Sequence, residues 1–126
     1  MKLGTLMVIN TIIAGIFGIS FIIIPWQVLS LYGVEPNPQL NYVGQLFGVA
    51  LFTFALLTWV ARKAGDSDAR KAIVMALFIG DGIGFIIALI AQLSGIVNAL
   101  GWSTVVIYLF LALGFGYFQV SKPKSD

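Results

Sequence analysis

Four long apolar segments determine what this chain can fold into. They run from about residue 3 to 24, 41 to 61, 69 to 94 and 98 to 120 of the 126-residue chain. Each is close to the ~20 residues that an α-helix needs to cross about 30 Å of hydrocarbon. The pattern predicts an all-α polytopic membrane protein, a four-helix bundle in one transmembrane domain (residues 1–126) whose consecutive helices are antiparallel neighbours.

The composition agrees with a lipid environment. Hydrophobic residues make up 60% of the chain and charged residues 10%, against about 25% charged residues in a typical soluble domain. The seven basic residues are spread over separate loops and form no stripe for nucleic-acid phosphates. Cysteine and histidine are both absent, which excludes thiol nucleophiles, imidazole bases and most transition-metal sites. We therefore expect no catalytic residues, no metal, no cofactor and no enzymatic activity.

A short helix is expected between the first two membrane segments. Pro25 suits a first helical position, and Gly33 suits the position just past a helix end. Its Trp26 and Tyr32 are typical of a helix lying in the membrane interface. Asn41 and Asn98 each precede an apolar run and are predicted N-caps of the second and fourth long helices.

The basic residues predict the orientation in the membrane. With four spans, all of them fall on one side: Lys2, Arg62, Lys63, Arg70, Lys71, Lys122 and Lys124. Basic loops stay in the cytoplasm, so both termini and the 62–71 loop are expected there. The tryptophans and tyrosines agree, because all but Tyr108 fall near one or the other predicted boundary of the membrane.

Asp81 is the candidate site residue that most needs an explanation. It lies eleven residues after Arg70, which places it about 16 Å into its helix and near the middle of the membrane. A carboxylate there costs roughly 2.5–3.5 kcal/mol on insertion scales. Asp81 could therefore be a proton-carrying or ligand-binding group, or a neutral hydrogen-bonded group that fixes the helix register. Asn10, Thr11, Thr53 and Tyr108 lie at a similar depth and complete the candidate ligand or proton site.

Small residues recur every four positions on the same helix. Ala72, Ala76, Gly80, Gly84 and Ala88 form a stripe that would let a neighbouring helix approach closely. Gly44 and Gly48 have the same spacing on the second long helix. Close packing is the favoured interpretation. The alternative is a loosened helix around Asp81 whose backbone can meet a ligand.

Three stretches resemble small four-helix bacterial integral membrane proteins of unknown function. They are residues 25–33 (PWQVLSLYG), the glycine-containing second segment ending in residues 59–62 (WVAR), and residues 93–102 (LSGIVNALGW). The resemblance implies a location in the prokaryotic cytoplasmic (inner) membrane and no particular activity. Small multidrug-resistance transporters are similar in length and helix count, but they rely on a glutamate in the first helix. Here the first helix has no acidic residue.

These observations favour a non-enzymatic multi-pass membrane protein, either an accessory subunit or a small-ligand binder with an intramembrane polar site around Asp81. The alternative is a proton-coupled small transporter or channel, which would be oligomeric because four helices alone rarely enclose a polar path. The lipid bilayer is the expected partner in both cases, together with further copies of the chain or a larger membrane complex.

Overall fold

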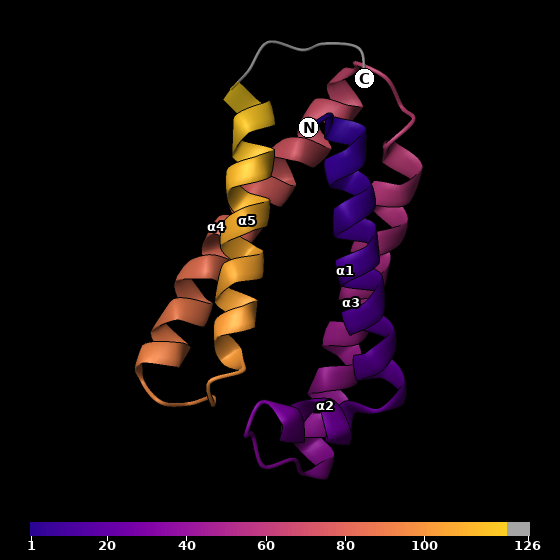
Figure 1. Ribbon diagram of the computed structural model, residues 1–126. Coiled ribbons are helices and arrows are strands. Elements are labelled where there is room, and N and C mark those ends of the chain that lie inside the picture. Colours follow the sequence, from indigo (N-terminus) through magenta and orange to yellow (C-terminus); the bar gives the residue numbers. More distant parts are fainter. Residues whose placement is uncertain (121–126) are drawn as a thin grey trace.

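The computed structural model describes residues 1–120, which form five α-helices and contain no strand (Figure 1). The helices are α1 (Leu3–Ile23), α2 (Pro25–Leu31), α3 (Pro38–Ala61), α4 (Asp68–Leu93) and α5 (Gly101–Val120). All except α2 are long and apolar enough to cross a membrane. An all-helical chain with four such segments is therefore confirmed for these residues. Lys122 and Lys124 lie outside the described part of the chain.

Two helix starts differ from the expectation. The α3 helix begins at Pro38, because Asn37 Oδ1 accepts a hydrogen bond from the Leu40 amide at 2.8 Å and Pro38 occupies the first helical position. The prediction that Asn41 is the N-cap was therefore wrong. Asn98 precedes α5 by three residues, and its Oδ1 accepts from the Leu100 amide at 3.0 Å in a turn before the helix.

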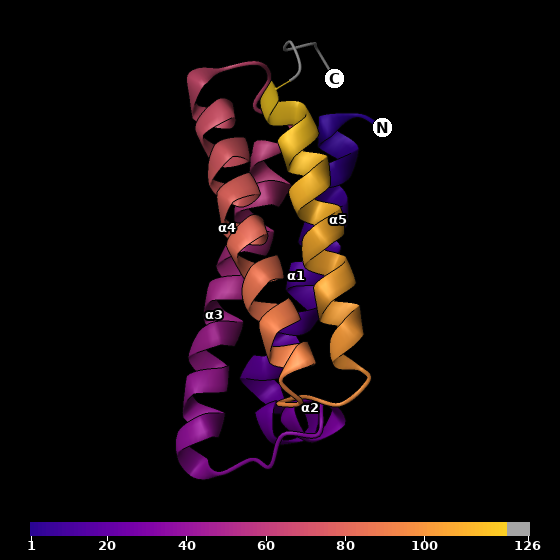
Figure 2. The same cartoon turned by 90° about the vertical axis from the view of Figure 1, so that its left-hand side faces the viewer.

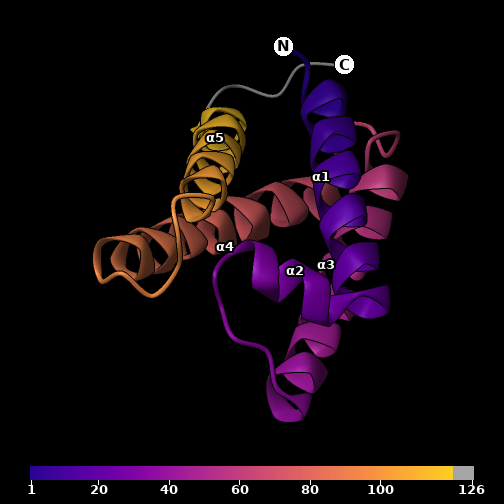
Figure 3. The same ribbon diagram turned by 60° about the horizontal axis from the view of Figure 1, so that its bottom comes forward.

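The long helices pack as two antiparallel pairs. In Figures 1 and 2, α1 lies along α3 and α4 lies along α5. The consecutive helices α3 and α4 share few contacts, and α4 leans away from the α1–α3 pair (Figure 3). The expectation that all consecutive helices are neighbours was therefore wrong for this step. Many large apolar side chains of α3, such as Phe54 and Leu57, stay exposed.

Glycines bring α1 and α3 into backbone contact. A Cβ added to Gly48 would lie 2.7 Å from the Gly18 carbonyl oxygen, and one added to Gly18 would lie 2.9 Å from the Gly48 oxygen. Only a residue without a side chain fits at this crossing. Gly44 is less constrained, since its added Cβ would meet the Phe21 ring at an ordinary 3.5 Å.

The small-residue stripe of α4 meets α5 over only part of its length. A Cβ on Gly84 would lie 2.5–2.8 Å from the Tyr108 ring, whereas a Cβ on Gly80 would have nothing within 4 Å. Ala88 is half-buried, and Ala72 and Ala76 are exposed. Residues four apart drift about 40° around a helix of 3.6 residues per turn. The stripe therefore turns away from α5 at Gly80, which packs against no other helix among residues 1–120.

The two helix pairs meet at both ends of the molecule. At one end lie the chain start and every basic residue between 1 and 120, and we refer to it as the basic end (Figure 1). There all four long helices contribute to a buried cluster of Leu3, Leu6, Met7, Ala61, Val74, Leu77, Leu111 and Phe115. At the opposite end, the Asn98 Nδ2 donates to the Leu31 carbonyl oxygen and the Asn98 amide donates to that of Tyr32, both at 3.0 Å.

Candidate functional site

Asp81 lies close to the midpoint of the 26-residue α4. Its side chain is half-buried, and its Oδ2 atom is fully buried with no hydrogen-bond partner among residues 1–120. Buried polar atoms are nearly always hydrogen-bonded, and an unpaired one loses about 1–3 kcal/mol. Asp81 is therefore an unsatisfied acceptor halfway along a helix of membrane-spanning length.

Tyr108 of α5 is the candidate residue that the structure brings near Asp81. The two side chains are close enough to interact electrostatically. The Tyr108 ring packs on Gly84, nearly one helical turn along α4 from Asp81. No hydrogen bond joins the two side chains within the described residues. The phenol is therefore near Asp81 but does not satisfy its buried oxygen.

Asn10 and Thr11 belong to a different polar cluster, between α1 and α3. The Asn10 Nδ2 donates to Thr58 Oγ1 at 3.3 Å, and the hydroxyls of Thr11 and Thr58 are 2.8 Å apart. Thr11 also donates to the Ala55 carbonyl oxygen at 3.2 Å. Asn10 and Thr58 are buried. These three side chains hydrogen-bond to one another and join the two helices, and in the described part of the chain no hydrogen bond leads from them to Asp81.

Thr53 takes part in neither group. Its side chain is exposed, and its hydroxyl donates to the Val49 carbonyl oxygen of its own helix at 2.9 Å. Among residues 1–120, Thr53 therefore makes no side-chain hydrogen bond to another helix, although it lies at the expected depth.

Thr58 is the residue that sequence reasoning missed. It lies only four residues before Arg62 and was not grouped with the mid-membrane polar residues. The antiparallel register of α1 and α3, in which Gly18 meets Gly48, places Thr58 beside Asn10 and Thr11. The sequence signal that could have predicted this register is the pair Gly44 and Gly48, because small residues four apart mark the place where two helices cross closely.

The chemistry available around Asp81 is that of hydrogen bonding and proton exchange. One carboxyl group and one phenol lie near each other on adjacent helices. Among residues 1–120, no three His, Cys, Asp or Glu side chains are placed to hold a metal ion. The arrangement can therefore accept a hydrogen bond from a ligand or a partner helix.

Comparisons with known proteins identify no relative of this chain. No protein-family model matches the chain, and neither the curated proteins nor the solved structures contain a significant match.

Proposed function

We propose that this chain is a non-enzymatic multi-pass membrane protein that binds a small ligand or a partner subunit through Asp81. The buried, unpaired Oδ2 of Asp81 carries this proposal. A hydrogen-bond donor supplied by the bound molecule would recover the free energy that the empty acceptor loses. The side chain as a whole is only half-buried, so a rotation of the carboxyl group would bring this buried oxygen within reach of an incoming donor.

The proposed setting is the cytoplasmic membrane of a prokaryote, with the basic end facing the cytoplasm. All basic residues between 1 and 120 lie at that end, as the retention of basic loops in the cytoplasm requires. The short helix α2 would lie in the opposite interface. Its Trp26 and Leu31 side chains are exposed, which suits contact with lipid headgroups and upper acyl chains.

Ligand retention tests this function. We would purify the wild type, Asp81→Asn and Asp81→Leu from native membranes in mild detergent and identify bound molecules by native mass spectrometry. Asparagine keeps an acceptor oxygen, so Asp81→Asn should retain the bound species, whereas Asp81→Leu should lose it. Thr53→Val is the matched control, because it removes a polar group from an exposed site on another helix. The same bound species on Asp81→Leu would refute the proposal.

A proton-coupled transporter or channel is the second candidate. It is favoured by the Oδ2 atom of Asp81, which has no hydrogen-bond partner among residues 1–120, because a carboxyl group that no fixed donor holds can exchange a proton. Such a protein would be oligomeric or part of a larger membrane complex. Gly80 is exposed, and a Cβ added to it would meet no atom of residues 1–120 within 4 Å, so this side of α4 leaves room for another helix.

A further inference from the structure

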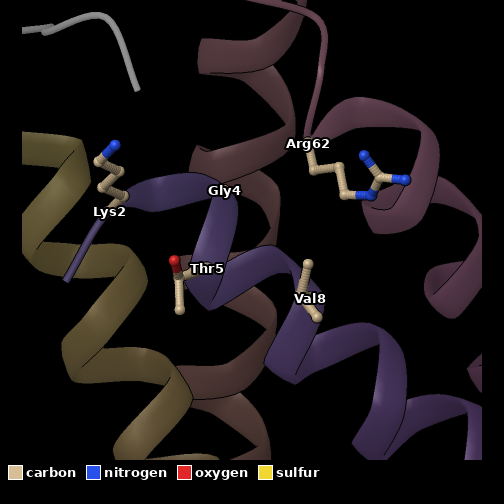
Figure 4. A pocket seen from close by; sticks show the side chains of 5 residues that line it. All are labelled: Lys2, Gly4, Thr5, Val8 and Arg62. Carbon is tan, nitrogen blue, oxygen red and sulfur yellow. The ribbon is translucent and has the colours of Figure 1, made fainter.

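A shallow hollow lies on the surface of the basic end, away from Asp81. It is lined by Lys2, Gly4, Thr5 and Val8 at the start of α1 and by Arg62 at the end of α3 (Figure 4). Its volume is about 330 Å³, and it is largely open to the surroundings. The geometry points to a binding site for the phosphate of an anionic lipid headgroup in this hollow.

The charge of the hollow suits a phosphate. Two of its five lining residues are cations, and none is acidic. In Figure 4, Lys2 and Arg62 stand on either side of the first two turns of α1. Both side chains are long and flexible, so each can turn towards an anion above Gly4 and Thr5.

The Arg62 guanidinium contacts an aromatic ring but retains hydrogen-bonding capacity. Its guanidinium carbon lies 3.7 Å from the centre of the Trp59 ring, a cation–π contact. Its Nε atom is buried and has no hydrogen-bond partner among residues 1–120. A guanidinium presents its donors in a planar fork that matches phosphate geometry.

Thr5 supplies an uncharged donor in the same hollow. Its hydroxyl makes no hydrogen bond within residues 1–120, whereas Thr11 and Thr53 each donate to the carbonyl oxygen four residues earlier. In Figure 4 the Thr5 oxygen points towards the helix start, where Lys2 lies. A phosphate in the hollow could accept from this hydroxyl.

The position of the hollow indicates a lipid rather than a soluble anion. It lies where α1 begins and α3 ends, which is headgroup depth for helices that span the bilayer. Trp59 beside it is 47% exposed, as expected for an interfacial tryptophan. Val8 continues the lining further along α1 and offers an apolar surface to the first carbons of an acyl chain. Basic pockets on the cytoplasmic side bind anionic headgroups in other membrane proteins.

Native mass spectrometry of the purified full-length protein tests this site. We would titrate it with phosphatidylglycerol and, separately, with phosphatidylcholine of the same acyl chains. The wild type should prefer phosphatidylglycerol. Arg62→Gln should weaken phosphatidylglycerol binding by about tenfold, because it removes a charge-assisted contact. The matched control Lys63→Gln removes the same charge from an exposed neighbour that does not line the hollow, and should change binding less than about twofold.

A second variant tests the site independently, in case Arg62→Gln does not fold. Thr5→Val keeps the side-chain shape and charge and should weaken phosphatidylglycerol binding by a few-fold. Equal effects of Arg62→Gln and Lys63→Gln, or unchanged binding in Thr5→Val, would show a diffuse attraction and overturn the site. Displacement of the lipid by submillimolar inorganic phosphate would assign the hollow to a free anion instead and would also overturn it.

Discussion

The polar side chains within the long helices differ in whether their buried atoms have hydrogen-bond partners. Asn10, Thr11 and Thr58 hydrogen-bond to one another between α1 and α3. Asp81 lies at mid-helix with one buried oxygen unpaired. A satisfied network stabilises the pairing of two helices, whereas an unsatisfied buried acceptor lowers stability unless another molecule supplies a donor. The first group is structural, and the second carries the proposed function.

Thr58→Val tests the structural role of the first group. Valine keeps the shape but removes the oxygen that accepts from Asn10, which leaves the buried Asn10 amide unpaired. We expect the free energy of unfolding to fall by about 1–3 kcal/mol, measured by denaturant titration in detergent micelles. Thr53→Val, at an exposed hydroxyl that bonds only within its own helix, should change stability by less than about 0.6 kcal/mol. Equal effects of the two variants would contradict the network.

Depth along the helices could be predicted from the sequence, but rotation about each helix axis could not. Counting residues placed Asp81 near mid-membrane and Tyr108 close to its level, and the structure brings these two near each other. The same count placed Thr53 with them, although its side chain is exposed. Which side of a helix a residue faces depends on the helix that packs there, and depth alone contains no such information.

At the scale of elements, glycines set how closely the helices approach. Gly18 and Gly48 allow backbone contact between α1 and α3, and Gly84 receives the Tyr108 ring between α4 and α5. Spacing by four residues predicted packing at Gly48, Gly80 and Gly84. Gly48 and Gly84 lie against another helix, whereas a Cβ on Gly80 would meet no atom of residues 1–120 within 4 Å. The drift of such a stripe around the helix axis explains the difference.

Two leucine substitutions on α4 test the different surroundings of Gly84 and Gly80. Gly84→Leu would place a side chain inside the Tyr108 ring and force α4 and α5 apart, so unfolding free energy should fall by about 1–3 kcal/mol or more. Gly80→Leu, about one turn away on the same helix, should be tolerated, because a Cβ at this position would meet no atom of residues 1–120 within 4 Å. Thermal melting of both variants in detergent, followed by circular dichroism, measures the contrast. If Gly84→Leu melts like the wild type, α5 does not pack on this face.

Local turn chemistry decided the helix boundaries. Hydropathy placed the apolar segments well, but α3 begins earlier because Asn37 and Pro38 form a stronger start signal than Asn41. That signal is present in the sequence as a cap residue followed by proline.

The whole molecule consists of two helix pairs joined mainly at their ends. The apolar cluster joins them at the basic end, and Asn98 joins them at the other through the backbone of Leu31 and Tyr32. The pairing could not be predicted because apolar residues cover the long helices on all sides, as lipid-facing helices require, and no single face marks the neighbour. Asp81 lies between these two junctions.

Topology reporters test the proposed orientation of the whole chain. Because basic loops stay in the cytoplasm, a reporter fused after Asp126 and one inserted near Asp66 should both read cytoplasmic. A reporter inserted near Asn37, in the loop between α2 and α3, should read external. An external signal from the Asp66 site would overturn the four-span arrangement.

Proton flux through the reconstituted protein is the most direct test of the proposed function. It distinguishes an Asp81 that binds a ligand or a partner subunit from an Asp81 that carries protons across the membrane. Purified wild type and Asp81→Asn would be placed in liposomes containing a pH-sensitive dye, and a proton gradient would be imposed across the membrane. Because α4 carries a single mid-helix carboxyl group, with one oxygen unpaired among residues 1–120, we predict the same slow leak for wild type, Asp81→Asn and protein-free liposomes. A flux in the wild type that Asp81→Asn abolishes, while the variant still folds, would contradict the binding function and establish proton-coupled transport.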